Sequence, residues 1–308
     1  MGKIRKIRQG NSLYVTEDET LVVVSNSRNG VYVYNLKGST SKPVFATKTV
    51  SDVACYALSQ DKKMLAAKST SGEIALISLE TGEELLRNEM WGKEGYPIVF
   101  TNDAKYVLDM DWNGRTMLLD CETNQVSVVD GPNIRGRNGY PYVSYMQYDR
   151  YSQQIIKIVE KAEKLSTGVV MASSSVPGKI KYRKIRKFKG YVPGWFDGIS
   201  LCKDRNYYYE RFNGIIVVTD KQFRELKRCP LPVEFAEFDS TSVHMWVSPC
   251  EKYLFLYCRG LSVLYEMKTM KPMLKFEYPF VCDFTMVEED SKFIISTWQG
   301  AYFGDIEE

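Results

Sequence analysis

The chain has 308 residues, of which 44% are hydrophobic and 26% charged, and its formal net charge is +3. This is an ordinary composition for a globular protein, and 13% aromatic residues favour a core built from strands. The first residues, MGKIRKIRQG, carry no apolar run, and no stretch approaches the roughly 18 apolar residues of a membrane span. These features argue against a secretory signal and a membrane helix. Seven cysteines without a Cys-x-x-Cys pair indicate reduced thiols, so we expect a cytoplasmic protein.

Two short markers recur along the whole chain with one period. The first is a polar turn, as in SQDKK and TNDAK, whose third residues are Asp18, Asp61, Asp103, Asp149, Asp204, Cys250 and Asp290. The second is a polar turn that ends in glycine, at Gly30, Gly72, Gly114, Gly168, Gly214, Gly260 and Gly300. Both series predict a repeat of about 40 to 45 residues, which is the length of a four-stranded propeller blade.

Short strands are predicted in the intervals between these markers. The second interval reads, in chain order, ACYALS (54–59), MLAAKS (64–69), EIALISL (73–79) and ELLRNEM (84–90). The third interval repeats this order with PIVFT (97–101), YVLDMD (106–111), RTMLLDC (115–121) and QVSVV (125–129). Each run is short and apolar or alternating, and each is bounded by turn residues, which is typical of strands in hairpins.

The two ends of the chain complement each other. After Gly300 only AYFGDIEE remains, which suffices for a third strand and not for a fourth. Residues 3–9, KIRKIRQ, form a predicted strand with no strand ahead of it. We therefore expect residues 3–9 to supply the outer strand of the last blade, so that no sheet edge is left open.

Three segments, SPCEK with the following YLFLYC, FTNDAKYVLDMD and LETGEELL, resemble the WD-repeat-like β-propellers. Blades of that superfamily often carry Ser-Pro-Asp-Gly-Lys and Asp-x-x-Thr-Gly turns. Together with the repeats, the resemblance predicts an all-β fold: a single seven-bladed β-propeller domain over residues 1–308, with four-stranded antiparallel blades. The expected blades span about 10–50, 51–92, 93–131, 132–189, 190–232, 233–279 and 280–308 plus 3–9.

The resemblance also implies that the links between blades and the second-to-third hairpins share one face. Three Gly-Tyr-Pro-like links, at Tyr96, Tyr140 and Tyr191, are either independent turns or parts of a shared binding face. Trp, Tyr and Arg are the residue types enriched in interface hot spots. The residues that we assign to this face are Arg28, Trp91, Lys93, Tyr96, Trp112, Arg135, Arg137, Tyr140, Tyr191, Trp195, Arg211, Arg259 and Trp298.

A basic run at residues 179–189, KIKYRKIRKFK, has no acidic residue. It indicates either a surface for an anionic partner such as nucleic acid or an outer strand whose charges discourage edge-to-edge association. The basic residues of this edge are Lys179, Lys181, Arg183, Lys184, Arg186 and Lys187. The fourth repeat also has 19 residues between Asp149 and Gly168, against 10 to 12 elsewhere. We expect this excess to lengthen the hairpin around Glu160 and Lys161.

Catalytic and metal-binding patterns are scarce in the sequence. His244 is the only histidine, so a zinc cluster is not predicted, and we expect His244 to pack on an inner strand. A calcium site remains an alternative if carboxylates of Asp109, Asp111, Asp197 and Asp283 converge, the other reading being separate acids.

Taken together, the sequence predicts a monomeric, non-catalytic scaffold that binds a protein or peptide and needs no cofactor. An enzyme or small-ligand binder with its site at the channel mouth is the alternative. Binding of nucleic acid or another anionic surface through basic outer strands is a lesser one.

Overall fold

A computed structural model provides the structure of the chain, and it describes residues 5–6, 12–15, 21–26, 30–36, 42–47, 50, 53–89, 98–101, 103–110, 116–130, 141–149, 151–152, 154–161, 167–174, 181–189, 196–211, 213–278, 280–287 and 290–306. Strands dominate these residues. The helical segments among them are two short 3-10 turns, η1 (Val233–Phe235) and η2 (Ser240–Ser242). The all-β class predicted from the sequence is confirmed.

Among the described residues, strand pairing produces seven four-stranded sheets, in which neighbouring strands follow one another in the sequence except that the first strand of the chain pairs with the last. The chain divides into two compact units, one comprising residues 1–24, 36–41 and 194–308, the other 25–35 and 42–193. The prediction of a single seven-bladed unit is wrong in this respect, because neither compact unit contains seven sheets. The sequence repeats report strand pairing within each sheet, whereas the grouping of sheets depends on side-chain packing that follows no repeat.

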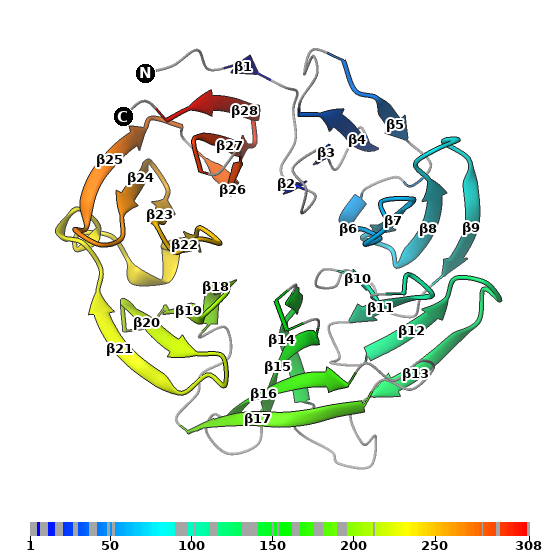
Figure 1. Ribbon diagram of the computed structural model, residues 1–308, viewed down its shortest axis with the longest axis horizontal. Helices are drawn as coiled ribbons and strands as arrows, with labels where there is room; N and C mark the ends of the chain where they lie inside the picture. Colours follow the sequence, from blue (N-terminus) through cyan, green and yellow to red (C-terminus); the bar gives the residue numbers. More distant parts are fainter. Residues whose placement is uncertain are drawn as a thin grey trace. The chain divides into compact units, whose positions relative to one another are not determined.

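The first unit contains three complete sheets, which Figure 1 draws from yellow-green to red, apart from the dark blue β1. One joins the N-terminal strand to the C-terminal strands. The strands of the first sheet are β18 (Phe196–Leu201), β19 (Arg205–Glu210), β20 (Ile215–Asp220) and β21 (Glu225–Pro230). Those of the second are β22 (His244–Val247), β23 (Tyr253–Cys258), β24 (Leu261–Glu266) and β25 (Lys271–Phe276). Those of the third are β26 (Val281–Val287), β27 (Lys292–Thr297), β28 (Gly300–Asp305) and β1 (Arg5–Lys6).

The second unit also contains three complete sheets, and a seventh sheet has strands in both residue sets. The strands of the first of these sheets are β6 (Val53–Leu58), β7 (Met64–Ser69), β8 (Glu73–Ser78) and β9 (Glu84–Glu89). Those of the second are β10 (Val99–Phe100), β11 (Tyr106–Met110), β12 (Thr116–Asp120) and β13 (Val126–Asp130). Those of the third are β14 (Pro141–Asp149), β15 (Gln154–Lys161), β16 (Thr167–Ser174) and β17 (Lys181–Lys189). The seventh comprises β2 (Ser12–Val15), β3 (Leu21–Asn26), β4 (Gly30–Asn35) and β5 (Phe45–Thr47).

The N-terminal strand β1 completes the sheet of the C-terminal strands. Arg5 lies opposite Phe303 and Lys6 opposite Tyr302, in antiparallel register. Figure 1 shows β1 at the outer edge of this sheet, next to β28. The expected pairing of the first strand with the last is therefore present at residues 5–6.

The repeated turns have the conformations that their residues favour. At the glycine turns, Gly72 and Gly260 have φ values of 96° and 87°, which side chains rarely adopt. At the Asp turns, the hydroxyl of Ser59 donates to Asp61 at 2.6 Å, and Thr101 donates to Asp103 in the same way. These side-chain bonds close the turn between the first two strands of a sheet.

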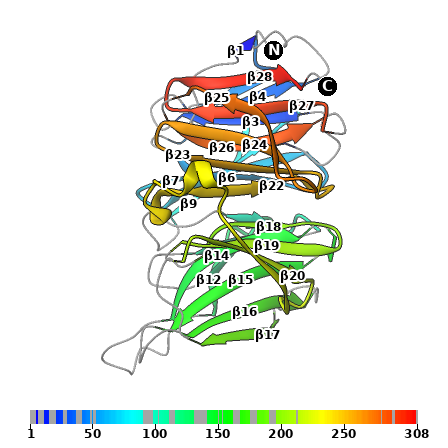
Figure 2. The ribbon, with the colours of Figure 1, turned by 90° about the vertical axis from the view of Figure 1, so that its left-hand side faces the viewer.

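The middle strands of each sheet supply the core. In β7 and β8 nearly every residue is buried, whereas the outer strand β9 is largely exposed. The buried residues of β7 and β8 pack with those of β11 and β12 in one apolar cluster. In the first unit, Phe255 of β23 stacks on Phe284 of β26 at 3.9 Å between ring centroids, and Phe293 and Phe276 pack around them. Figure 2 shows these sheets from the side.

The sheet of β14 to β17 has strands of 8 or 9 residues, against 6 in each strand of β6 to β9. Gly168 lies inside β16, opposite Glu160, and not in a turn. Part of the excess between Asp149 and Gly168 lengthens the second strand, since β15 has 8 residues against 6 in β7, and residues 162–166 lie outside the described residues.

Candidate functional site

Three of the residues assigned to the binding face lie in the described chain: Arg211, Arg259 and Trp298. Each is in the turn between the second and third strands of its sheet, and all three sheets belong to the first unit. The structure thus places these three as the sequence predicted, in equivalent turns. Outside the described residues lie Arg28, Trp91, Lys93, Tyr96, Trp112, Arg135, Arg137, Tyr140, Tyr191 and Trp195.

Arg259 and Trp298 meet at a third residue, Phe280, and we call these three residues the hairpin cluster. The guanidinium of Arg259 lies over the Phe280 ring, 5.5 Å from its centroid. The Phe280 and Trp298 rings are 6.0 Å apart, and the Trp298 amide donates to the Phe280 carbonyl at 3.4 Å. All three side chains are exposed, and Trp298 most of all, at 70%. The cluster is a mixed aromatic and cationic surface.

The residues beneath the hairpin cluster hold it in place. The Tyr257 hydroxyl donates to the Cys282 carbonyl at 3.3 Å, and the His244 ring stacks on Tyr257 at 5.0 Å between centroids. Burial raises the pKa of the Cys282 thiol to about 11, the nearby Asp283 adds to this, and a hydrogen bond with the Trp298 side chain opposes it. Trp298 is therefore anchored on one side although most of its surface is open.

His244 lies on β22, the first strand of its sheet, as predicted. Its ring is stacked and half-buried, and among the described residues no group of three His, Cys, Asp or Glu side chains could hold a metal ion. Of the four acids considered for calcium, Asp109 forms an ion pair with Lys68 at 2.5 Å, and both side chains are fully buried. Asp283 accepts hydrogen bonds from the amides of Phe284 and Leu13. Asp111 and the side chain of Asp197 lie outside what the structure describes.

The cysteines have the chemistry of structural residues. All seven are described, and no disulfide joins them. Burial raises the pKa of the Cys55 thiol to about 11 and that of Cys121 to about 12, and it also raises the pKa values of Cys250 and Cys258. A thiol that stays protonated is a weak nucleophile. The burial of these four thiols therefore does not favour nucleophilic catalysis by them.

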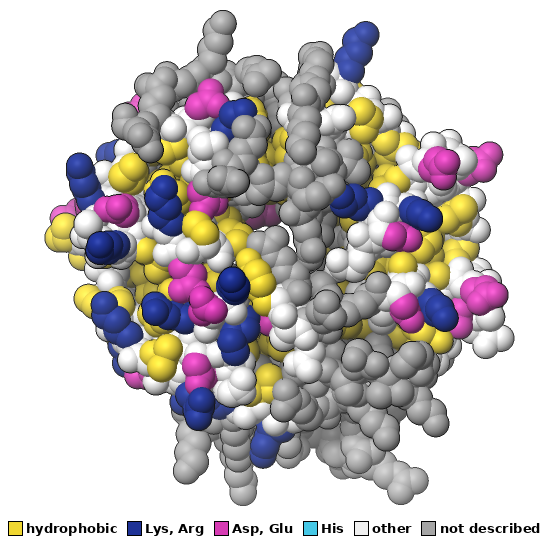
Figure 3. Space-filling model, in the orientation of Figure 1, with side chains coloured by type: hydrophobic (Ala, Val, Ile, Leu, Met, Phe, Trp, Pro, Cys, Tyr) yellow, Lys and Arg dark blue, Asp and Glu magenta, His cyan; other side chains and the backbone are white. Residues whose placement is uncertain are grey.

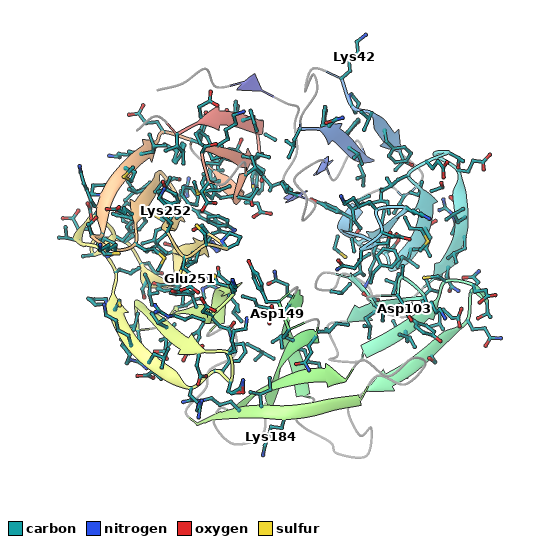
Figure 4. All side chains as sticks on the ribbon, viewed as in Figure 1. Lys42, Asp103, Asp149, Lys184, Glu251 and Lys252 are labelled. Carbon is teal, nitrogen blue, oxygen red and sulfur yellow. The ribbon has the colours of Figure 1, made fainter. Side chains whose placement is uncertain are left out.

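The basic residues predicted at an outer edge lie on β17, the last strand of its sheet, except Lys179, which is outside the described residues. Lys184 is exposed and points away from the sheet (Figure 4), and Arg186 is half-buried. This strand belongs to the second unit, and the hairpin cluster belongs to the first. On the face shown in Figure 3, by contrast, basic and acidic side chains are interspersed over the sheets of the first unit.

Sequence reasoning missed Phe280, the residue that joins Arg259 to Trp298. A usable signal was present, because Phe280 follows a Tyr-Pro dipeptide, Tyr278–Pro279, like those of the Gly-Tyr-Pro links. Here a glutamate stands in place of the glycine, so a search for glycine passed over this link. Tyr278 itself stacks on Tyr302 at 4.7 Å between centroids.

No protein-family model and no curated protein matches the sequence. Among solved structures, the chain is similar to the β-propeller domain of Cps50 (Swd1) from Myceliophteria thermophila, with a TM-score of 0.71 and 10% sequence identity. The alignment covers 99% of this chain and 99% of that domain. The chain has a β-propeller fold. At 10% identity this similarity concerns the fold alone. In addition, no helix among the described residues of this propeller is long and apolar enough to cross a membrane.

Proposed function

We propose that this β-propeller is a non-catalytic scaffold in a reducing compartment such as the cytoplasm, and that it binds a protein or peptide through its hairpin turns and inter-sheet links. The observation that carries this proposal is the hairpin cluster. Aromatic and arginine side chains supply most of the energy in protein interfaces, and here Arg259, Phe280 and Trp298 are already in contact.

The contacts within the hairpin cluster favour a role in binding over exposure without a function. Single surface apolar residues are common and need no explanation, but an exposed Trp held against Phe280 and Cys282 loses little side-chain entropy on binding. The cation above Phe280 adds a group that can pair with a carboxylate or a backbone carbonyl of the partner. We expect Arg211 and the undescribed residues assigned to this face to extend the surface.

The test uses the double variant Arg259→Ala/Trp298→Ala. Affinity capture from cell extract with the wild type, followed by mass spectrometry, gives candidate partners, and each is then purified and titrated against both proteins. Buried anchors of this type contribute about 2 kcal/mol each, so binding should weaken about a hundredfold to a thousandfold, because the two contributions need not add in full.

The matched control is Leu226→Ala/Lys227→Ala on the outer strand β21, where Leu226 is 59% exposed. This pair removes a similar exposed apolar and cationic surface, and it should leave binding within about twofold. Both double variants should have the same melting temperature as the wild type. A purified partner that binds the Arg259→Ala/Trp298→Ala protein as tightly as the wild type would rule out the hairpin cluster as its site.

A further inference from the structure

The outer strand β17 differs from the other outer strands in length. It has 9 residues, whereas β9, β21 and β25 have 6 each and β13 has 5. It pairs with β16 on one side, and among the described strands none pairs with its other side. Figures 1 and 2 both show β17 at the outer margin of its sheet. A long unpaired edge offers backbone amide and carbonyl groups to another extended chain.

The charge of β17 also exceeds what protection of an edge requires. One or two charges discourage edge-to-edge association, and β25 has two lysines while β9 and β21 carry both signs. The sequence of β17, KYRKIRKFK, has six basic residues and no acid. Its neighbour β16 has no acid either.

Strand register distributes these charges over both faces of the sheet. The partners of β17 alternate along β16, with a register shift between Val170 and Met171 that leaves Ile185 as the extra residue. Residues opposite Thr167, Val169, Met171 and Ser173 share one face, and they are Lys189, Lys187, Lys184 and Tyr182. The other face carries Phe188, Arg186, Arg183 and Lys181. Each face of the edge thus carries three basic residues and one aromatic residue.

From this arrangement we propose that β17 is a docking edge for an extended acidic peptide segment, which pairs with it as a fifth strand of the sheet. Backbone hydrogen bonds would supply part of the affinity, and carboxylates on both faces of the segment would lie opposite the basic residues. A phosphodiester backbone would use charges on one face and leave the edge amides unpaired. Two-sided charge beside a free edge therefore favours a peptide over a nucleic acid.

The experiment measures fluorescence anisotropy of a labelled acidic peptide that is long enough to pair along β17 and carries Glu or Asp on both faces. Lys184→Glu/Lys187→Glu should weaken its binding at least about tenfold, because both substitutions put like charges opposite each other. The matched control, Lys271→Glu/Lys275→Glu on the outer strand β25, reverses two charges and should change binding less than about twofold. If the first variant proves unstable, Lys184→Gln is compared with Lys271→Gln.

A second probe separates strand pairing from charge attraction. The same peptide with N-methyl groups on alternate amides keeps its carboxylates but loses the donors of one edge, so it should bind at least about tenfold more weakly. Equal binding of the methylated and unmethylated peptides would overturn the proposal, as would equal losses in the two charge-reversal variants. A single-stranded oligonucleotide or phosphatidylserine vesicles that bind more tightly than the peptide, and lose binding in Lys184→Glu/Lys187→Glu, would assign the edge to a different anion. None of these outcomes depends on the hairpin cluster.

Discussion

The buried ion pair of Lys68 and Asp109 joins two neighbouring sheets of the second unit. Lys68 lies on β7 and Asp109 on β11, and neither side chain is exposed to solvent. Removing one partner of such a pair leaves a buried charge without compensation. We therefore expect Lys68→Met to lower the free energy of unfolding by about 3 to 5 kcal/mol. Chemical denaturation of the variant and the wild type measures the difference.

The double variant Lys68→Met/Asp109→Leu is the informative comparison for this pair. Both charges are then gone, and apolar residues of similar size fill the site, so much of the lost stability should return. If the double variant loses more free energy of unfolding than Lys68→Met and Asp109→Leu lose together, the site depends on its charges and not on their mutual compensation.

Asp283 gives the protein a pH-dependent stability that can be isolated. Burial raises the pKa of its carboxyl from 3.8 to about 6, and the amides of Phe284 and Leu13 only partly oppose this. Because the folded protein holds this proton more tightly than the unfolded chain, the stability contribution falls as pH rises from about 4 to about 6, by at most about 3 kcal/mol. Above that range the folded state carries the full cost of a buried charge.

The variant Asp283→Asn removes this titration and keeps an acceptor for the Phe284 amide. The melting temperature of the variant minus that of the wild type should increase between pH 4 and pH 6 and then level off. Loss of the Leu13 hydrogen bond shifts the whole curve without changing its slope. A difference that stays constant with pH would contradict the buried, protonated carboxyl.

The acidic residues show what could not be predicted from the sequence at the scale of single residues. The sequence identified Asp109 and Asp283 as candidates for a shared cation site, but the partner of Asp109 is 41 positions away in another sheet. Ion pairs across sheets follow from packing and leave no local pattern. The positions of exposed turn residues were easier to predict, because Arg259 and Trp298 could be placed by counting strands.

At the scale of the element, the Asp turns contain residues in the left-handed region. Lys62 has φ of 58°, Ala104 of 57° and Glu251 of 60°, each directly after the third residue of its marker. A side chain in this region costs about 1 kcal/mol relative to glycine. We expect Lys62→Gly to raise the free energy of unfolding by about 0.5 to 1 kcal/mol, as measured by denaturant titration.

Its neighbour provides the control for this prediction. Lys63, whose amide bonds to the Asp61 carboxylate, is outside the left-handed region, so Lys63→Gly adds only backbone freedom to the unfolded chain and should destabilise slightly. Equal effects of the two glycines would show that backbone strain at Lys62 is negligible. The marker predicted the turn but not the strained position within it, because the marker fixes the side-chain bonds and not the dihedral angles.

At the scale of the whole molecule, the sequence predicted the strand pairing well and the assembly of sheets less well. Periodic markers report where chains reverse, so the hairpins could be anticipated from turn residues and apolar alternation. The lengths of the strands could not be anticipated, because β14 to β17 extend beyond the common strand length without any change in turn residues. The division into two compact units was not anticipated, because the apolar residues that pack sheets together look alike in every repeat.

The pairing of the two ends of the chain supports a final prediction. The strand β1 covers the edge of β28, where Phe303 and Ala301 are buried, through the pairs Arg5–Phe303 and Lys6–Tyr302. Deleting residues 1–9 should remove this short pairing and expose the edge of β28, at a cost on the order of 1 to 3 kcal/mol and with a greater tendency to aggregate. Thermal melting and light scattering of the truncated protein measure both effects.

Proline substitutions in the full-length chain separate pairing from the mere loss of residues. In an antiparallel edge strand, alternate amides face the neighbour, so one of Arg5→Pro and Lys6→Pro removes a hydrogen bond and the other does not. The two variants should therefore differ in melting temperature, and the less stable one should approach the truncated protein. If truncation leaves the melting temperature and the light scattering unchanged, β1 does not contribute to the stability of this sheet, and the two prolines should then be equivalent.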